Sequence, residues 1–310
     1  MTRDEILRAF DRIRVWQQGG HRAPHKPLLI LLALGRLVRG ENPVVEFSEI
    51  EGKLKELLTE FGPSSAPATR HHPFWHLATD RGAGDTPIWE LKGPPEILKR
   101  PPAATPNLSE LREYHVSGGF PEPLRRALLA EPGLVSEITR RLLDAHFPET
   151  LRQDVLDAVG LTLDSSGDGA FDTQTRRRRD PSFREKVLLA YEYRCCVCSY
   201  DLRLGRQSVG LEAAHIKWFQ AGGPDIENNG LALCALHHKI FDLGAFTIQP
   251  EDRVMVFSRH LIGSPDIQNR LLSYHGTPLI NPQSKEFMPN PDFLDWHQRE
   301  VFKKPGRSIC

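Results

Sequence analysis

The chain has 310 residues, of which 26% are charged and 39% hydrophobic. These proportions are ordinary for folded globular proteins and exclude a disordered or membrane-embedded chain, and the length suits about two domains. Lysine plus arginine and aspartate plus glutamate number 40 each, so the whole-chain charge gives no hint of a polyanionic partner.

The N-terminal residues carry no targeting signal that we recognise. Residues 1–5 open a charged amphipathic pattern, and the longest apolar stretch, residues 28–34, is too short to cross a bilayer. We therefore expect a cytoplasmic protein without a membrane partner.

The first half of the sequence is typical of a helix-rich domain with one small hairpin. Apolar residues at helical spacing, Pro27 at a first helical position, and a capping box of Ser48 and Glu51 predict the first three helices. Two aromatic segments around the turn 80–85 predict the hairpin, and the proline-rich stretch 93–106 predicts an exposed connection. In chain order we expect helices over 2–15, 28–38 and 48–61, strands over 73–77 and 88–91, and helices over 109–114, 121–130 and 136–145.

A polar glycine-serine segment without periodicity, residues 164–169, predicts a domain boundary. We expect one domain over residues 1–162, a polar and basic linker over 163–182, and a second domain over 183–310. Since no repeat crosses the boundary, the two halves should differ in fold. The linker contains four consecutive arginines that either form a solvated face or neutralise DNA phosphates: Arg176, Arg177, Arg178 and Arg179.

Cysteines gather in the second half, in a window that is also rich in histidine. This distribution is typical of a metal site in a reducing compartment and not of a disulfide framework. Cys195 and Cys198 form one pair with two intervening residues, and Cys234 and His237 form a second pair with the same spacing. We expect the two pairs to hold a structural zinc ion, with Cys196 as a packed thiol.

The residues between and after these pairs predict a strand, a loop, a second strand and a helix. The first strand, 209–216, includes His215, the second covers 231–233, and the helix covers 237–242; further strands are expected over 247–248 and 254–257. The pattern resembles the HNH (ββα-metal) endonuclease family, and the match rests on Cys195, Cys198, His215, Asn229, Cys234 and His238.

This resemblance implies a metal-dependent DNA endonuclease. His215 would be the general base that takes a proton from the attacking water, and His238 would hold a catalytic Mg²⁺ or Mn²⁺ ion. Asn229 would fix the loop that aims His215, with Asn228 as the competing candidate. Many family members have a metal-binding residue immediately before the base, but this chain has Ala214 there.

Glu212 is the substitute that strand alternation allows for that missing metal ligand, because it lies on the same strand face as Ala214. A second departure from the family is His237, which stands where the family usually has cysteine.

The first half also resembles a known family, the sulfur-binding domain of McrA-like type IV restriction enzymes. The resemblance rests on His25-Lys26-Pro27-Leu28-Leu29, Pro73-Phe74-Trp75-His76-Leu77, Gly118-Gly119-Phe120 and the segment 146–151. It implies recognition of phosphorothioate-modified double-stranded DNA. Phe147, Pro148 and Leu151 would line an apolar cavity for the sulfur atom, and His115 and Arg152 would contact the DNA backbone or bases.

The family more often has tyrosine at the position of Phe147, and the alternative is that Phe147 and Pro148 only end a helix and pack in the core.

Together these observations predict an α+β protein in which a helix-rich DNA-recognition domain precedes an HNH nuclease domain with a structural zinc. The expected function is a modification-dependent restriction endonuclease, active as a homodimer because a double-strand break needs two cuts. Two alternatives stay open at this point: an HNH nuclease guided by methylcytosine or by sequence, and a zinc-containing DNA-binding regulator without catalysis.

Overall fold

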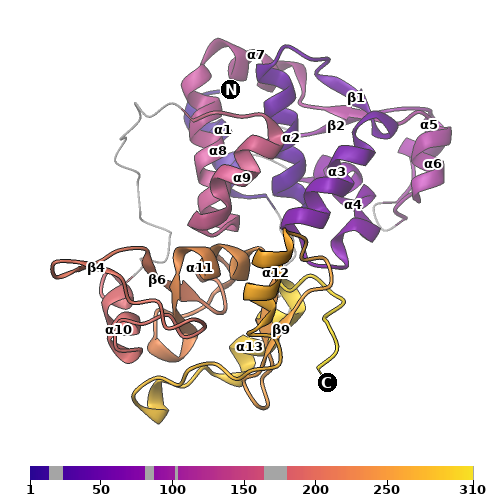
Figure 1. The fold of residues 1–310 in the computed structure, drawn as a ribbon. Coiled ribbons are helices and arrows are strands. Elements are labelled where there is room, and N and C mark those ends of the chain that lie inside the picture. The colour runs from indigo at the N-terminus through magenta and orange to yellow at the C-terminus, as the bar shows by residue number, and fades with distance from the viewer. Residues whose placement is uncertain (14–23, 81–86, 102–103, 164–179, 310) are drawn as a thin grey trace. The chain divides into compact units, whose positions relative to one another are not determined.

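The computed structural model describes residues 1–13, 24–80, 87–101, 104–163 and 180–309 (Figure 1). These residues form two compact units with separate hydrophobic cores, one up to residue 163 and one from residue 180 onward. Most of the expected linker, including the segment 164–169 and Arg176 to Arg179, lies outside the described residues. Within the described part, no helix is long and apolar enough to span a membrane.

The first unit packs helices around one central helix and adds a small sheet. Helix α2 contacts α3, α4, α8 and α9. Its residues Leu28 to Leu31 are fully buried, which fits a helix that is apolar on all sides. The elements are α1 (Arg3–Asp11), α2 (His25–Val38), β1 (Val44–Glu46), α3 (Phe47–Phe61), η1 (Ala66–Thr69), α4 (His71–His76), η2 (Leu77–Thr79), β2 (Glu90–Lys92), α5 (Pro95–Leu98), α6 (Leu108–Glu113), β3 (Ser117–Gly119), α7 (Glu122–Ala130), α8 (Pro132–His146) and α9 (Glu149–Val159).

The three strands form one antiparallel sheet in the order β1-β3-β2. Two glycines of the central strand make close packing possible: a Cβ on Gly118 would lie 2.6 Å from the Trp89 ring, and one on Gly119 would lie 2.2 Å from the Pro43 carbonyl oxygen. The Gly-Gly pair is therefore a packing requirement of this sheet.

The prediction of a hairpin from these two aromatic segments is wrong. Residues 73–77 belong to α4 and η2, and only the second aromatic segment contributes a strand, β2. Phe74 and Trp75 are consecutive and both buried, with α4 packed on α2 and α3. A strand with one solvent-exposed face would have exposed one of these two rings.

Two further details differ from the expectation. Helix α3 begins at Phe47 after Glu46, without a side-chain cap, so Ser48 lies inside the first turn. Glu51 is not part of a capping box because its carboxylate accepts hydrogen bonds from Arg70 and Arg112. The stretch 93–106 is not simply an exposed connection, since it contains α5, whose Ile97 is fully buried.

The second unit contains the expected strand, strand, helix order. Strands β6 and β7 pair antiparallel, and α11 follows directly. The α+β fold class is confirmed. The elements are α10 (Phe183–Ala190), β4 (Arg203–Leu204), β5 (Gln207–Ser208), β6 (Leu211–His215), η4 (Phe219–Ala221), η5 (Glu227–Asn229), β7 (Gly230–Cys234), α11 (Ala235–Asp242), β8 (Phe246–Ile248), β9 (Met255–Phe257), α12 (Pro265–Leu272), η6 (Lys285–Phe287) and α13 (Pro291–Glu300).

Candidate active site and metal centre

The β6–β7 hairpin determines where His215 and Cys234 lie relative to each other. Its register pairs Leu211 with Cys234 at one end and His215 with Gly230 at the other. Because β7 is buried along its whole length, the hairpin is held against the core. His215 therefore lies at the end of the hairpin opposite to Cys234.

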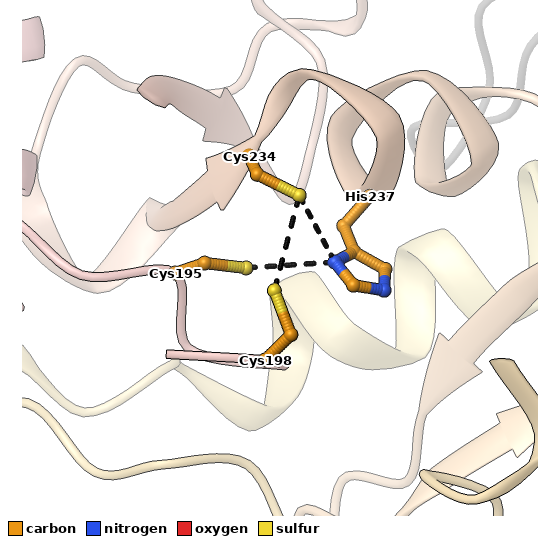
Figure 2. A group of neighbouring side chains, drawn as sticks. All are labelled: Cys195, Cys198, Cys234 and His237. Carbon is orange, nitrogen blue, oxygen red and sulfur yellow. Dashed lines mark hydrogen bonds between the residues drawn. The ribbon is translucent and has the colours of Figure 1, made fainter. Parts of the chain in front are cut away.

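Four side chains from two segments converge at the Cys234 end (Figure 2). Their ligand atoms all lie within 4.8 Å of one another, with the His237 Nδ1 atom 3.1 Å from Cys234 Sγ and 3.6 Å from Cys195 Sγ. Cys198 Sγ lies 4.0 Å from Cys234 Sγ. Tetrahedral ligands about 2.3 Å from a zinc ion lie about 3.8 Å apart, so three thiolates and one imidazole at these separations fit zinc.

A tight turn brings the first pair together. The Cys195 amide donates to the Tyr200 carbonyl and the Ser199 amide donates to the Cys195 carbonyl, with Ser199 in the left-handed region at φ 60°. Cys196 lies outside the cluster and is buried. Its burial raises the pKa of the Cys196 thiol well above its ordinary value, which keeps the side chain a neutral packed thiol.

His215 contacts a carboxylate and an aromatic ring. Its Nε2 atom lies 2.7 Å from Asp225 Oδ1. Phe183, the first residue of α10, stacks on the imidazole with ring centroids 4.0 Å apart and an interplanar angle of 17°. The sequence interpretation missed both contacts.

Asn229 is fully buried and uses both ends of its side-chain amide. Its Oδ1 atom accepts from the Lys217 amide at 2.9 Å, and its Nδ2 atom donates to the carbonyls of Lys217 at 3.0 Å and Pro224 at 2.9 Å. The asparagine thus joins both ends of the loop between the two strands. Asn228 instead offers its backbone carbonyl to the Asn290 amide.

His238 lies on α11 between two carboxylates. Its Nδ1 atom is 2.7 Å from Glu212 Oε2 and its Nε2 atom is 3.2 Å from Asp242 Oδ2, one helical turn further on. Burial disfavours the charged imidazole, but Asp242 and Glu212 outweigh it and raise the pKa of His238 to about 9. The hydrogen bond with His238 lowers the pKa of Glu212. The two carboxylates contact opposite ring nitrogens, so a single ion could share the deprotonated His238 ring with Glu212 or with Asp242, and a carboxylate plus an imidazole are donors that Mg²⁺ and Mn²⁺ accept.

Helix α13 supports the helix that carries His238. The buried His297 ring stacks on Phe241 of α11, with ring centroids 3.7 Å apart and an interplanar angle of 1°. Its Nδ1 atom lies 3.0 Å from Thr247 Oγ1 and its Nε2 atom 3.1 Å from the Phe241 carbonyl oxygen. His297 is therefore a packing residue of the second unit.

The residues expected to contact sulfur and DNA lie in the first unit. Phe147 and Leu151 are buried, and Pro148 is the half-buried residue that precedes α9. The side chain of His115, 76% exposed, has its Nδ1 atom 3.2 Å from Glu46 Oε2, and Arg152 pairs with Asp144 at 2.6 Å. Packing accounts for the burial of Phe147 and Leu151, and their contact with sulfur stays a prediction.

Comparison with known families defines the class of both units. The family model described as HNH endonuclease matches residues 195–249, so the second unit contains an HNH endonuclease domain. The model described as ScoMcrA-like, DNA sulfur-binding domain matches residues 3–164, more than half of the chain. The chain belongs to this ScoMcrA-like family, and both resemblances seen in the sequence are confirmed.

Several solved structures are similar to about half of the chain. The sulfur-binding domain of ScoMcrA complexed with phosphorothioated DNA is 21% identical, with a TM-score of 0.43 over 50% of this chain and 94% of that chain. The corresponding SprMcrA complex is 19% identical, with a TM-score of 0.41 over 52% and 95%. The modification-dependent restriction endonuclease TagI is 23% identical, with a TM-score of 0.30 over 46% and 41%. No curated protein matches the chain.

Proposed function

We propose that this protein is a modification-dependent restriction endonuclease that binds phosphorothioate-modified double-stranded DNA and hydrolyses nearby phosphodiester bonds. The observation that carries the proposal is the combination of two matched domains in one chain, a DNA sulfur-binding domain followed by an HNH endonuclease domain. The solved ScoMcrA and SprMcrA domains are complexes with phosphorothioated DNA, and they support this choice of partner.

His215 and His238 have separate tasks in the proposed reaction. His215 takes a proton from water as the water oxygen attacks phosphorus. His238, assisted by Glu212, holds the catalytic divalent ion, Mg²⁺ or Mn²⁺. When bound, this ion neutralises negative charge that develops on the phosphate and on the leaving 3′ oxygen.

Zinc has a structural task in this account. Cys195, Cys198, Cys234 and His237 would hold the ion and thereby join the turn before the hairpin to the start of α11. With four protein ligands the coordination sphere is complete, which is the arrangement of structural and not of catalytic zinc.

Recognition of sulfur depends on its weaker hydration. Sulfur is larger and softer than the phosphate oxygen that it replaces, so an apolar surface at the half-buried Pro148, backed by the buried Phe147 and Leu151, would penalise oxygen, which loses water there. His115 and Arg152 would contact the DNA backbone or bases. The arginine run of the linker, Arg176 to Arg179, would neutralise phosphates and make binding depend on salt.

A homodimer would suit the task. Each chain has one HNH site, and a break in both strands needs two cuts, which two copies related by symmetry supply.

The binding part of the proposal is tested with the full-length His215→Ala variant, which should cut its DNA too slowly to deplete it during the titration. Matched duplexes with and without one phosphorothioate linkage are titrated at fixed salt. We expect tighter binding of the sulfur-containing duplex, and equal affinities would contradict sulfur recognition.

The catalytic part is tested by nicking of modified plasmid DNA. We expect His215→Ala to cut about 100-fold more slowly or worse than the unchanged protein, because a general base contributes about 10²–10⁴-fold. The matched control is His260→Ala, an exposed histidine of the same unit whose Nε2 atom contacts the Lys304 carbonyl oxygen. A His215→Ala variant that cuts normally would remove the assignment of the base.

A further inference from the structure

Asp225 is the acidic side chain that faces the candidate general base. Its Oδ1 atom lies 2.7 Å from His215 Nε2, and the carboxylate side chain is only 9% exposed. We infer that Asp225 is a positioning residue, whose carboxylate fixes the tautomer and the orientation in which His215 accepts a proton. This inference rests on the proposed function, since it concerns the same reaction.

The short Nε2 to Oδ1 contact decides which ring nitrogen carries the proton. A neutral imidazole has one N–H donor and one lone-pair nitrogen, and an ionised carboxylate is only an acceptor. Nε2–H therefore donates to Asp225, and Nδ1 keeps the lone pair that takes a proton from water. Without a carboxylate at this place, the imidazole would prefer the Nε2–H tautomer less strongly.

The Asp225 carboxylate is itself fixed by the backbone. Its Oδ2 atom accepts a hydrogen bond from the Asp180 amide at 2.7 Å. Asp180 stands shortly before α10, whose first residue, Phe183, stacks on the His215 ring. The carboxylate and the phenyl ring therefore restrain the same imidazole from two directions.

The loop that carries Asp225 is closed by Asn229. The Asn229 amide bonds the backbone of Lys217, two residues after His215, and of Pro224, the residue before Asp225. Closure is tight: a Cβ on Gly223 would lie 1.7 Å from the Lys217 carbonyl oxygen. By holding the backbone next to His215 and next to Asp225, Asn229 keeps the two side chains in contact.

The proton balance of the step is complete with these groups. An O–H bond of water breaks, its proton passes to His215 Nδ1, and the water oxygen forms a bond to phosphorus while the bond to the leaving 3′ oxygen breaks. The leaving oxygen takes a proton from solvent. The imidazolium that forms is stabilised by the Asp225 carboxylate until it releases its proton.

The test compares full-length variants on phosphorothioate-modified plasmid in Mg²⁺ at saturating DNA. Asp225→Asn keeps the shape and an acceptor oxygen but removes the charge, and Asp225→Glu restores the charge. Asp201→Asn, at an exposed carboxylate of the same unit, is the matched control. Zinc content, thermal unfolding and affinity for modified duplex are measured for each variant, because a positioning residue should leave all three unchanged.

We expect Asp225→Asn to lower kcat about 100-fold with KM unchanged, Asp225→Glu to recover part of that loss, and Asp201→Asn to cut normally. The acid limb of the rate–pH profile should move to lower pH in Asp225→Asn, because the imidazolium loses its anionic partner. Normal cutting by Asp225→Asn, or an equal loss in the Asn and Glu variants with an unmoved pH profile, overturns the inference.

The control reaction separates this inference from the proposed function. If the unchanged protein cuts no DNA, the proposed function fails before Asp225 is examined. If the unchanged protein cuts, His215→Ala does not, and Asp225→Asn cuts normally, the nuclease assignment stands and only the role of Asp225 is wrong.

Discussion

His215 and His238 differ in the charge that surrounds them. His215 has one short contact to a carboxylate and a phenyl ring stacked on its face. His238 lies between Glu212 and Asp242, so two negative charges face one imidazole. The first environment suits a proton acceptor and the second suits a cation, which is how the proposal divides their tasks.

The sequence predicted which side chains come together where this depends on local spacing. The cluster of three cysteines and His237 follows from two pairs with the same spacing, and Glu212, proposed from strand alternation, contacts His238. Asp225 was missed because its contact with His215 depends on closure of the loop between them. Gly223, the residue before Pro224, was the available signal, since its close approach to the Lys217 carbonyl requires a glycine.

Glu212 provides a residue-scale prediction about the catalytic ion. In Glu212→Gln one of the two charges that face His238 is lost, so the Mn²⁺ concentration for half-maximal cutting should rise about 10- to 100-fold. Direct Mn²⁺ binding by calorimetry should weaken in parallel. Glu251→Gln, an exposed carboxylate in the turn between β8 and β9, is the control. Unchanged Mn²⁺ affinity would exclude Glu212 as a ligand.

At the scale of elements, periodic helices and the ββα order were predictable, whereas short aromatic segments were not. Residues 73–77 have the composition of a strand but form α4, because burial against α2 and α3 places two consecutive rings inside. Helices α10, α12 and α13 were not predicted, although Ser264-Pro265 and Asn290-Pro291 are local start signals for α12 and α13.

Contact between α2 and α9 gives an element-scale prediction. A Cβ on Gly35 would lie 2.1 Å from the Val159 carbonyl oxygen, so Gly35→Ala should force the helices apart and destabilise the first unit by about 1–3 kcal/mol. In α3, Gly52 has open space around it, so Gly52→Ala should stabilise by about 0.5–1 kcal/mol. Denaturant unfolding measures both, and equal effects would contradict this packing.

The cluster of Cys195, Cys198, Cys234 and His237 links a turn to a helix, so loss of the proposed zinc ion should destabilise the whole second unit. We expect Cys198→Ala to lose zinc, to lower the melting temperature of that unit and to stop cutting, because structural zinc contributes folding free energy. Cys196→Ala, outside the cluster, should keep its zinc. Full zinc content in Cys198→Ala, measured with a colorimetric chelator after unfolding, would be incompatible with the proposed ligand set.

For the whole molecule, the balanced net charge does not reveal that the chain contains two domains with different functions. Two units with separate cores carry two matched families, one for DNA sulfur binding and one for cutting. Sequence patterns could identify this order of domains. The recognised bases and the cleavage distance depend on how both units bind the same DNA. No local sequence pattern predicts that arrangement.

The most direct test of the account is a paired digest by the full-length protein. One plasmid preparation carries backbone phosphorothioates and the other has the same sequence without sulfur, and both are incubated with Mg²⁺ or Mn²⁺ at fixed salt. We predict that only the sulfur-containing plasmid is cut. Equal cutting of both plasmids, or preference for a methylated plasmid without sulfur, would contradict phosphorothioate-dependent restriction.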